Sequence, residues 1–470
     1  MQFIYRYIII MAILLVPAGV FAETSINQTD TTSPILPQDS LPFDVSIELA
    51  SFSLPNGFHS GVFAIYKGKW LILAGRTNGM HGFGPGIGNF PPSKQNTDVF
   101  VIDPKKGTVY TRSLSDPTSG LNQQQIDLLS VTSPQWYYTE STMYMCGGYG
   151  VDTATGQFST KPVLTAIDLS GFVSWVLNAT PNGAVKNIRQ ITHPLVQVTG
   201  GYMDSADPHL FTLLIFGQNF QGLYTSNSNG VYTEQVRCFQ IVDNAGDLYI
   251  QPRKMENPNP NYRRRDLNVL PVIHNNKEAF VALSGVFTEA GGVWTVPVFI
   301  NTDGTTKMAN PASPGAFKQG MNNYISGRAG LYSSSTKNMY MLLLGGISYG
   351  FFTNGVFEVD SNIPFINEVT TVKLDKKGNY TQYLMNAQFP VMISTGSNPG
   401  NPLLFGAGSN FIPTTNVSRF SNEVVQFDKL KGPTVIGYVV GGIMSTLGNT
   451  NDQADSTGSP YIFQVVVTPK

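Results

Sequence analysis

The chain has 470 residues, of which 41% are hydrophobic and only 13% are charged, against about 25% charged in an average soluble domain. With 29 Lys and Arg against 30 Asp and Glu, the formal net charge is -1, which disfavours binding to nucleic acid or to an anionic membrane surface by charge alone. Low charge together with 47 Gly and 30 Pro is typical of an all-β protein with many tight turns.

The N-terminus has the pattern of a secretory signal peptide. Arg6 gives a positive start, residues 8–16 are apolar, and Val20-Phe21-Ala22 places small residues where cleavage would occur. An uncleaved anchor is the alternative, but the apolar stretch is shorter than the ~20 residues that a membrane span needs. We therefore expect a signal peptide over 1–22, a flexible leader over 23–42, no stable membrane span, and export to the periplasm or beyond.

The first structural unit reads as four strands, which we call A to D. They are expected at 61–66, 70–74, 98–102 and 108–112, with short turns between A and B and between C and D. Asp and Gly in these turns suit the left-handed backbone of a tight hairpin. A strand C followed by such a turn recurs at 167–171, 242–246, 301–304 and 374–378.

Strand B of this unit recurs as an apolar run that ends in glycine. The first glycine of each run is found at 75, 147, 217, 285, 345 and 441, and four of the five gaps between them are 60 to 72 residues long. A spacing of this size indicates one repeated supersecondary unit. Four-stranded units repeated around an axis form a β-propeller.

The two ends of the chain predict how the ring closes. The last unit offers strands A to C at 423–427, 434–440 and 461–467 but no strand D, while an alternating strand at 45–52 precedes the first unit. If this strand completes the last blade, the chain is an all-β, six-bladed propeller over residues 43–470. Seven blades are the alternative, because 403–408 resembles another strand B. Only 35 residues separate Gly406 from Gly441, however, so 386–420 is interpreted as an insertion.

Taken together, the apolar run ending in Gly-Gly, the strand and turn after it, and an aromatic residue in strand D resemble the kelch repeat. The aromatic residues are Trp175 in the second unit and Tyr380 and Tyr383 in the fifth. The resemblance is to kelch-type propellers of secreted bacterial proteins and to the central domain of galactose oxidase. It implies arginines near the channel mouth that bind acidic ligands.

Loop lengths select one face of the expected propeller. The connections from B to C and from D to A are long, and in a four-stranded meander both emerge on the same face, where binding residues concentrate. Guanidinium groups on this face would bind carboxylate, sulfate or phosphate; at blade junctions they can instead tether neighbouring carbonyl groups. The candidate ligand-binding residues are His59, Arg76, His81, Arg189, Arg265, Arg328 and Arg419.

Several kinds of chemistry find no support in the sequence. The five histidines are scattered, so neither a metal site nor a copper site of the galactose oxidase kind is expected, and no cofactor is expected. The glycine-rich segment 82–88 lacks the order of a P-loop, and no Gly-x-Ser-x-Gly elbow is present. Cys146 and Cys238 fall in expected strands and are interpreted as buried free thiols, although a disulfide remains open in an oxidising compartment.

The sequence favours a binding module over an enzyme. Its loop-rich face would recognise an acidic glycan, peptide or protein partner. The first alternative is a carbohydrate-active enzyme, epimerase-like or lyase-like, that uses arginine with a carboxylate at the channel mouth. The second is a purely structural envelope protein whose channel is plugged by residues 386–420.

Overall fold

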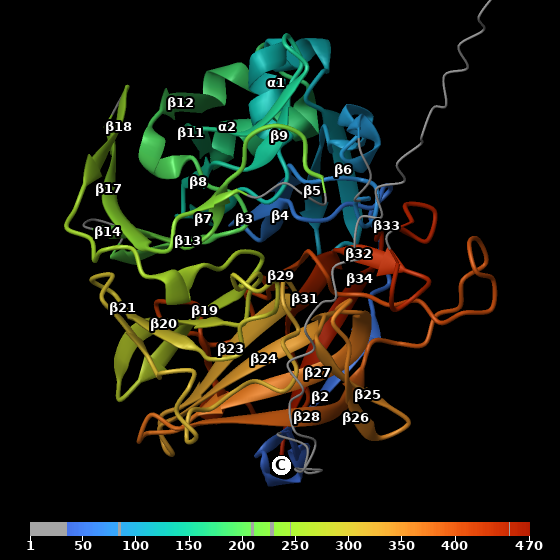
Figure 1. Ribbon diagram of the computed structural model, residues 1–470. Helices are drawn as coiled ribbons and strands as arrows, with labels where there is room; N and C mark the ends of the chain where they lie inside the picture. Colours follow the sequence, from blue (N-terminus) through green and yellow to red (C-terminus); the bar gives the residue numbers. More distant parts are fainter. Residues whose placement is uncertain (1–34, 83–85, 208–210, 226–229, 245, 451) are drawn as a thin grey trace, which may run out of the picture. The chain divides into compact units, whose positions relative to one another are not determined.

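The computed structural model describes residues 35–470, apart from 83–85, 208–210, 226–229, 245 and 451. In this part of the chain, sheets follow one another around a centre, and the colours in Figure 1 pass from blue through green, yellow and orange to red around it. The expected all-β propeller is therefore confirmed. The expected signal peptide (1–22) and residues 23–34 of the expected leader lie outside the described residues.

Five sheets have the four antiparallel strands expected of a blade. The first comprises β3 (Val62–Tyr66), β4 (Lys69–Leu73), β5 (Asp98–Asp103) and β6 (Thr108–Ser113). The second comprises β7 (Gln135–Tyr138), β8 (Thr142–Cys146), β11 (Val163–Asp168) and β12 (Ile188–Thr192). The third comprises β13 (Tyr202–Asp207), β14 (Phe211–Ile215), β17 (Val236–Asn244) and β18 (Asp247–Pro252). The fourth comprises β19 (Asn268–His274), β20 (Lys277–Leu283), β21 (Val298–Asn301) and β22 (Thr306–Met308). The last comprises β29 (Ser409–Pro413), β31 (Thr434–Gly441), β34 (Ile462–Pro469) and β2 (Phe43–Leu49).

Between the fourth and the last of these blades lies a sheet of six strands. Its central strands are β23 (Gly327–Ser333), β24 (Asn338–Ile347), β27 (Phe365–Leu374) and β28 (Tyr380–Gln388). Two short strands, β1 (Leu36–Pro37) and β30 (Val425–Gln426), pair in parallel with its two edges. The expectation of six or seven four-stranded blades is therefore wrong: five blades have four strands, and the remaining large sheet has six.

The two ends of the chain meet in the last blade. β2 pairs antiparallel with β34 from Phe43↔Pro469 to Leu49↔Phe463, so the N-terminal strand completes that sheet as expected. The expected inner strand at 423–427 is wrong, because β29 takes this place and Val425 joins β23 instead. The segment 386–420 therefore contains a blade strand. Residues 403–408 form no strand of their own, and Leu404 makes only an isolated bridge with Ser445.

Short hairpins join the strands on one face. Lys67 and Gly68 connect β3 to β4 with φ angles of 47° and 76°, and Asn275 and Asn276 connect β19 to β20 with 51° and 62°. Two successive left-handed residues match the twist of paired strands. The expected short turn after 167 is wrong, because a helix, α2 (Leu169–Asn178), begins there. Asp168 caps it by accepting a hydrogen bond from the Gly171 amide at 2.8 Å.

Helix α2 also contains one residue of the kelch-like pattern that was expected in a strand. Trp175 lies in α2 and is fully buried, so it is not the strand D aromatic that the sequence suggested. Tyr380 and Tyr383 do lie in β28, the fourth strand of their sheet. The other helix, α1 (Gln123–Leu129), lies in the connection from β6 to β7.

The opposite face carries the longer connections. Each of four such connections holds a two-stranded sheet of its own between the second and third strands of a large sheet. These are β9 (Tyr149–Asp152) with β10 (Gln157–Thr160), β15 (Gln218–Asn219) with β16 (Val231–Tyr232), β25 (Gly350–Thr353) with β26 (Val356–Val359), and β32 (Ile443–Ser445) with β33 (Ser456–Gly458). One face therefore carries mostly short turns. We call the other, which carries the long connections and their small sheets, the elaborated face.

The core lies between successive sheets. Each neighbouring pair shares a cluster of buried apolar side chains, and the cluster of Trp70, Ile72, Phe100, Ile412 and Val440 joins the last blade to the first. Burial of this apolar surface is the main force that closes the ring.

Both cysteines lie in this interior. Cys146 and Cys238 are buried and free, as expected. Among the residues that the structure describes, no helix is long and apolar enough to cross a membrane.

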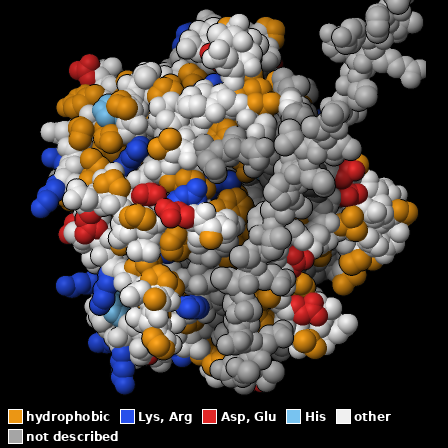
Figure 2. Space-filling view, viewed as in Figure 1, with side chains coloured by type: hydrophobic (Ala, Val, Ile, Leu, Met, Phe, Trp, Pro, Cys, Tyr) orange, Lys and Arg blue, Asp and Glu red, His pale blue; other side chains and the backbone are white. Residues whose placement is uncertain are grey.

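The surface seen in Figure 2 mixes charges of both signs. Among the described residues on this face, basic and acidic side chains lie between uncharged and hydrophobic ones, and no large area carries one sign. This distribution agrees with the net charge of -1.

Candidate functional site

A pocket of about 170 Å³ opens where the central channel meets the elaborated face. Two positions in every large sheet supply its wall. The first position lies a few residues before the innermost strand of the sheet. The second position directly follows the glycine that ends the second strand. The first set is His59, Thr132, Thr199, Arg265, Tyr324 and Ala407; the second is Arg76, Tyr149, Gln218, Val286, Ile347 and Ile443.

Backbone pairing holds the two sets together. The residues bridge one another as His59↔Arg76, Thr132↔Tyr149, Thr199↔Gln218, Arg265↔Val286 and Tyr324↔Ile347. In the last blade, the Ile443 amide donates to the Ala407 carbonyl at 2.6 Å. Each sheet therefore presents side chains from the same two positions to the pocket, and the residue types at these positions differ between sheets.

The floor of the pocket is a ring of six residues, one after each member of the first set. We call it the axial ring: Ser60, Ser133, Gly200, Asp266, Ile325 and Gly408. All six have left-handed backbones, with φ angles from 48° to 67°, a conformation that is costly for most residues other than glycine.

Backbone hydrogen bonds join five of the six neighbouring pairs in this ring. They run from Ser133 to Ser60, from Ser60 to Gly408 and from Gly408 to Ile325, and also from Asp266 to Gly200 and from Gly200 to Ser133, with donor–acceptor distances of 2.5 to 3.2 Å. The strained conformation thus places amide donors and carbonyl acceptors around the axis.

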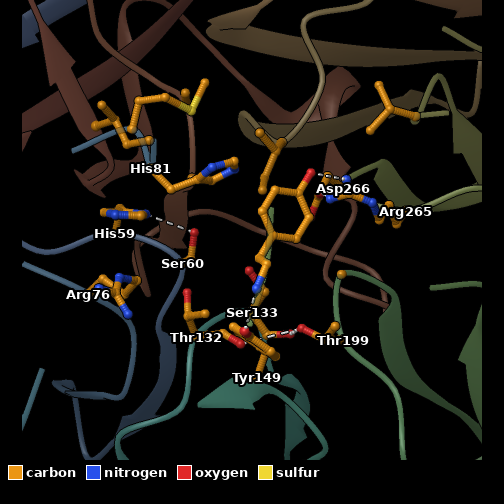
Figure 3. A pocket seen from close by; sticks show the side chains of 18 of the residues that line it. His59, Ser60, Arg76, His81, Thr132, Ser133, Tyr149, Thr199, Arg265 and Asp266 are labelled. Atoms are coloured by element: carbon orange, nitrogen blue, oxygen red, sulfur yellow. Dashed lines mark hydrogen bonds and ion pairs between the residues drawn. The ribbon is translucent and has the colours of Figure 1, made fainter. Parts of the chain in front are cut away.

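Figure 3 shows how the polar groups face one another. His59, Ser60 and Arg76 lie on one side, and Arg265 and Asp266 lie on the other. Much of the remaining wall is aromatic, with Phe90, Tyr149, Phe220, Tyr224, Phe287 and Tyr324. An apolar wall with few polar groups is typical of a site for a small molecule.

Arg76 is a cation without a carboxylate partner. It is 2% exposed, its Nε donates to Asn78 Oδ1 and its Nη2 donates to the Pro91 carbonyl, both at 3.0 Å, and its guanidinium lies 4.9 Å from the Phe90 ring centre. No described carboxylate pairs with it, and Nη1 makes no hydrogen bond to a described residue. Burial lowers the pKa of Arg76 to about 10, so it remains charged at neutral pH.

The two histidines of the pocket are neutral. Burial, with the nearby charge of Arg76, lowers the pKa of His59 to about 3. Burial also lowers the pKa of His81 to about 4. His59 Nδ1 lies 3.0 Å from Ser60 Oγ, and the His81 ring stacks on Phe90. Neutral imidazoles can donate or accept a hydrogen bond here without adding charge.

Arg265 differs from Arg76 because its charge is compensated. It pairs with Asp266, and its Nε and Nη2 donate to the hydroxyl groups of Tyr232 and Tyr224 at 3.2 and 3.1 Å. Burial acts to lower its pKa, but Asp266 and the two tyrosines outweigh burial and raise it above the usual range. The pocket therefore holds one ion pair and one uncompensated cation.

Three other sequence candidates lie elsewhere. Arg189 is in the outermost strand β12 and pairs with Asp243 at 2.5 Å. Arg419 lies in the connection from β29 to β31, and its guanidinium donates hydrogen bonds to the carbonyl groups of Thr414 and Ile436. Arg328 lies within β23, on the far side of the axial ring from the pocket. Of the seven candidates, the structure brings together His59, Arg76, His81 and Arg265.

The aromatic wall and the other members of the two sets were not predicted from the sequence. A signal for the second set was present, because each member directly follows the glycine or glycine pair that ends strand B. The first set has no such mark, because its residues share only a backbone conformation.

The described residues contain no group of three or more His, Cys, Asp or Glu side chains that could hold a metal ion. No family model matches the chain. No curated protein matches it either. Among the solved structures that do match is one titled "Structure of YjhT", with 10% sequence identity and a TM-score of 0.43 over 88% of this chain and 98% of that one.

Proposed function

We propose that the pocket binds a small acidic ligand, foremost an acidic sugar residue of a glycan, and that Arg76 is its charge partner. The observation that carries this proposal is the buried guanidinium of Arg76, which has only neutral hydrogen-bond partners among the described residues. Buried charges are normally paired, so an anionic ligand would complete this environment.

The size of the pocket supports a single sugar residue. One water-sized position needs roughly 10–15 Å³ of cavity volume. The pocket of about 170 Å³ therefore holds on the order of a dozen ligand atoms. The aromatic wall offers apolar contact to one face of a ring, while His59, His81 and Thr199 supply neutral polar contacts. In this proposal the chain is an exported, kelch-like binding module.

The test is a calorimetric titration with matched sugars. Glucuronic and galacturonic acids should bind, and glucose and galactose should bind at least about tenfold more weakly, because they lack the charge. Arg76→Gln should weaken binding of the acids by about 10- to 100-fold, the usual loss for a hydrogen bond to a charged group. Arg189→Gln is the matched control and should bind normally. Equal binding by Arg76→Gln and the wild type would contradict the proposal.

A second candidate function is acid–base catalysis on the bound sugar. It is favoured by Asp266, whose carboxylate lines the same pocket across from His59 and Arg76. The test is proton NMR of the acidic sugars in deuterated buffer. Exchange of a carbon-bound proton by the wild type, but not by Asp266→Asn, would make the protein an enzyme of the epimerase or lyase type. Binding without exchange would leave it a binding module.

A further inference from the structure

A second cavity, of about 70 Å³, lies in the central channel on the other side of the axial ring. The six ring residues line both the pocket and this cavity. The rest of its wall comes from the residues that follow the ring in each chain segment, chiefly in the innermost strands β7, β13, β23 and β29. The ring therefore divides the channel into two chambers with different walls.

Arg328 is the basic group of this second chamber, and the other charged residue of its lining, Asp266 of the axial ring, is paired with Arg265. Arg328 Nε donates to the Val269 carbonyl at 2.7 Å, its Nη1 lies 3.5 Å from the Ser326 carbonyl, and its guanidinium lies 5.3 Å from the Tyr202 ring centre. Its Nη2 makes no hydrogen bond to a described residue, and no described carboxylate forms an ion pair with it. Two N–H donors of a cation therefore remain for a ligand.

The carboxylate whose charge acts on Arg328, that of Asp204, is hydrogen-bonded to other groups. Asp204 accepts hydrogen bonds from the Tyr202 hydroxyl at 2.6 Å and from the Ser205 amide at 2.7 Å. Burial raises its pKa to about 6, so it is still mostly ionised at neutral pH. Asp204 acts on Arg328 through its charge, but the two side chains form no direct ion pair, so the Nη2 donors of Arg328 are not taken up by this carboxylate.

Gln135, from strand β7, lines the same chamber and adds an independent observation. It is 1% exposed, and its Nε2 donates to the Ser133 carbonyl of the axial ring at 2.6 Å. This bond fixes the orientation of the amide, and the buried Oε1 accepts no hydrogen bond. A buried acceptor left unpaired is costly, so a ligand with a donor group would be stabilised beside it.

From this arrangement we propose that the second chamber is a separate site for a small hydroxy-carboxylate, with Arg328 binding the carboxylate and Gln135 Oε1 accepting from the hydroxyl. The volume sets the size, because about 70 Å³ at roughly 10–15 Å³ per atom-sized position holds on the order of five to seven atoms. Glycolate, with five non-hydrogen atoms, fits this range. The site is independent of the proposed sugar site, since it shares only the axial ring with it.

The test uses glycolate and acetate as probes in calorimetric titrations of the folded chain at constant ionic strength. The wild type should bind glycolate more tightly than acetate by about two- to tenfold, the usual value of one neutral hydrogen bond. Gln135→Met, which keeps the length of the side chain but has no acceptor, should remove this preference and leave acetate binding unchanged. Arg328→Gln should weaken binding of both by at least about tenfold.

Arg76→Gln is the control that separates the two sites, and it should bind glycolate as the wild type does. Loss of glycolate binding in Arg76→Gln but not in Arg328→Gln would place the anion in the outer pocket and overturn the inference. The absence of glycolate binding by the wild type would also overturn it, whatever the outcome with acidic sugars. If thermal melting shows that Arg328→Gln does not fold, Gln135→Met still decides, because an unchanged preference for glycolate would contradict the proposal.

Discussion

Arg76 and Arg265 reach the same pocket from opposite sides, yet their surroundings differ. Arg76 is held by an amide and a backbone carbonyl, whereas Arg265 is held by a carboxylate and two phenol hydroxyl groups. The first arrangement fixes the position of a charge without compensating it, and the second compensates the charge. The comparison teaches that the number of arginines in a pocket says little about anion binding until their partners are known.

The largest expected effect concerns stability on the Arg265 side. Arg265→Gln leaves the carboxylate of Asp266 unpaired, and the side chains of this ion pair are only 13% and 18% exposed. Breaking a buried pair in this way should lower the free energy of unfolding by about 3 kcal/mol, measured by urea denaturation. Arg189→Gln breaks a more exposed pair, with Arg189 33% exposed, and should cost less than about 1 kcal/mol. Equal losses would show that Arg265 and Asp266 are not coupled as described.

A smaller effect, on ligand affinity, is expected from the substitution Asp266→Asn, which leaves Arg265 as a second uncompensated cation. Asp266→Asn removes the charge but keeps the shape of the side chain, so the pocket gains one net positive charge. Affinity for glucuronic acid should rise by about tenfold, a change of about 1.4 kcal/mol, measured by calorimetry. The control is Asp243→Asn, at the outer edge of the molecule, which should leave affinity unchanged. Weaker binding in Asp266→Asn would mean that the carboxylate contacts the ligand directly.

The smallest expected effect is that of pH on binding. His59 and His81 have pKa values lowered to about 3 and about 4, and Arg76 has one lowered to about 10. Between about pH 5.5 and about pH 8, the histidines therefore stay neutral and the arginine stays charged. Affinity for glucuronic acid, which is ionised throughout, should change by less than about twofold over this range. A steep increase in affinity below about pH 6.5 would show that a histidine becomes charged and binds the anion.

The propeller was predictable from the sequence because its signals are local. Apolar runs ending in glycine mark the second strands, and two-residue turns such as Lys67-Gly68 fix the hairpins. The N-terminal strand at Phe43–Leu49 could be placed because the last unit lacked a partner for it. The short parallel strands β1 and β30 could not be predicted, since two-residue segments carry no periodicity and pair only through tertiary contacts.

The site was predictable only in part, for a related reason. Arg76 and Arg265 were found because both stand near recognisable strands, but Arg189 and Arg419 also do, and their partners lie in segments distant in sequence. Whether an arginine is compensated depends on those distant partners. The inner strand of the last blade was misplaced for the same reason, because only tertiary pairing decides that Ser409–Pro413 joins the last blade while Val425–Gln426 joins β23.

The axial ring has a consequence for how this protein can change. Its backbone hydrogen bonds join five of the six neighbouring pairs of sheets, all except the pair that contributes Asp266 and Ile325, so most of the base of the pocket is braced independently of the loops above it. Hairpins of very different length already rise from the same rim. New ligand preferences can therefore be acquired one loop at a time, while the hydrogen bonds of the axial ring hold the neighbouring sheets in register.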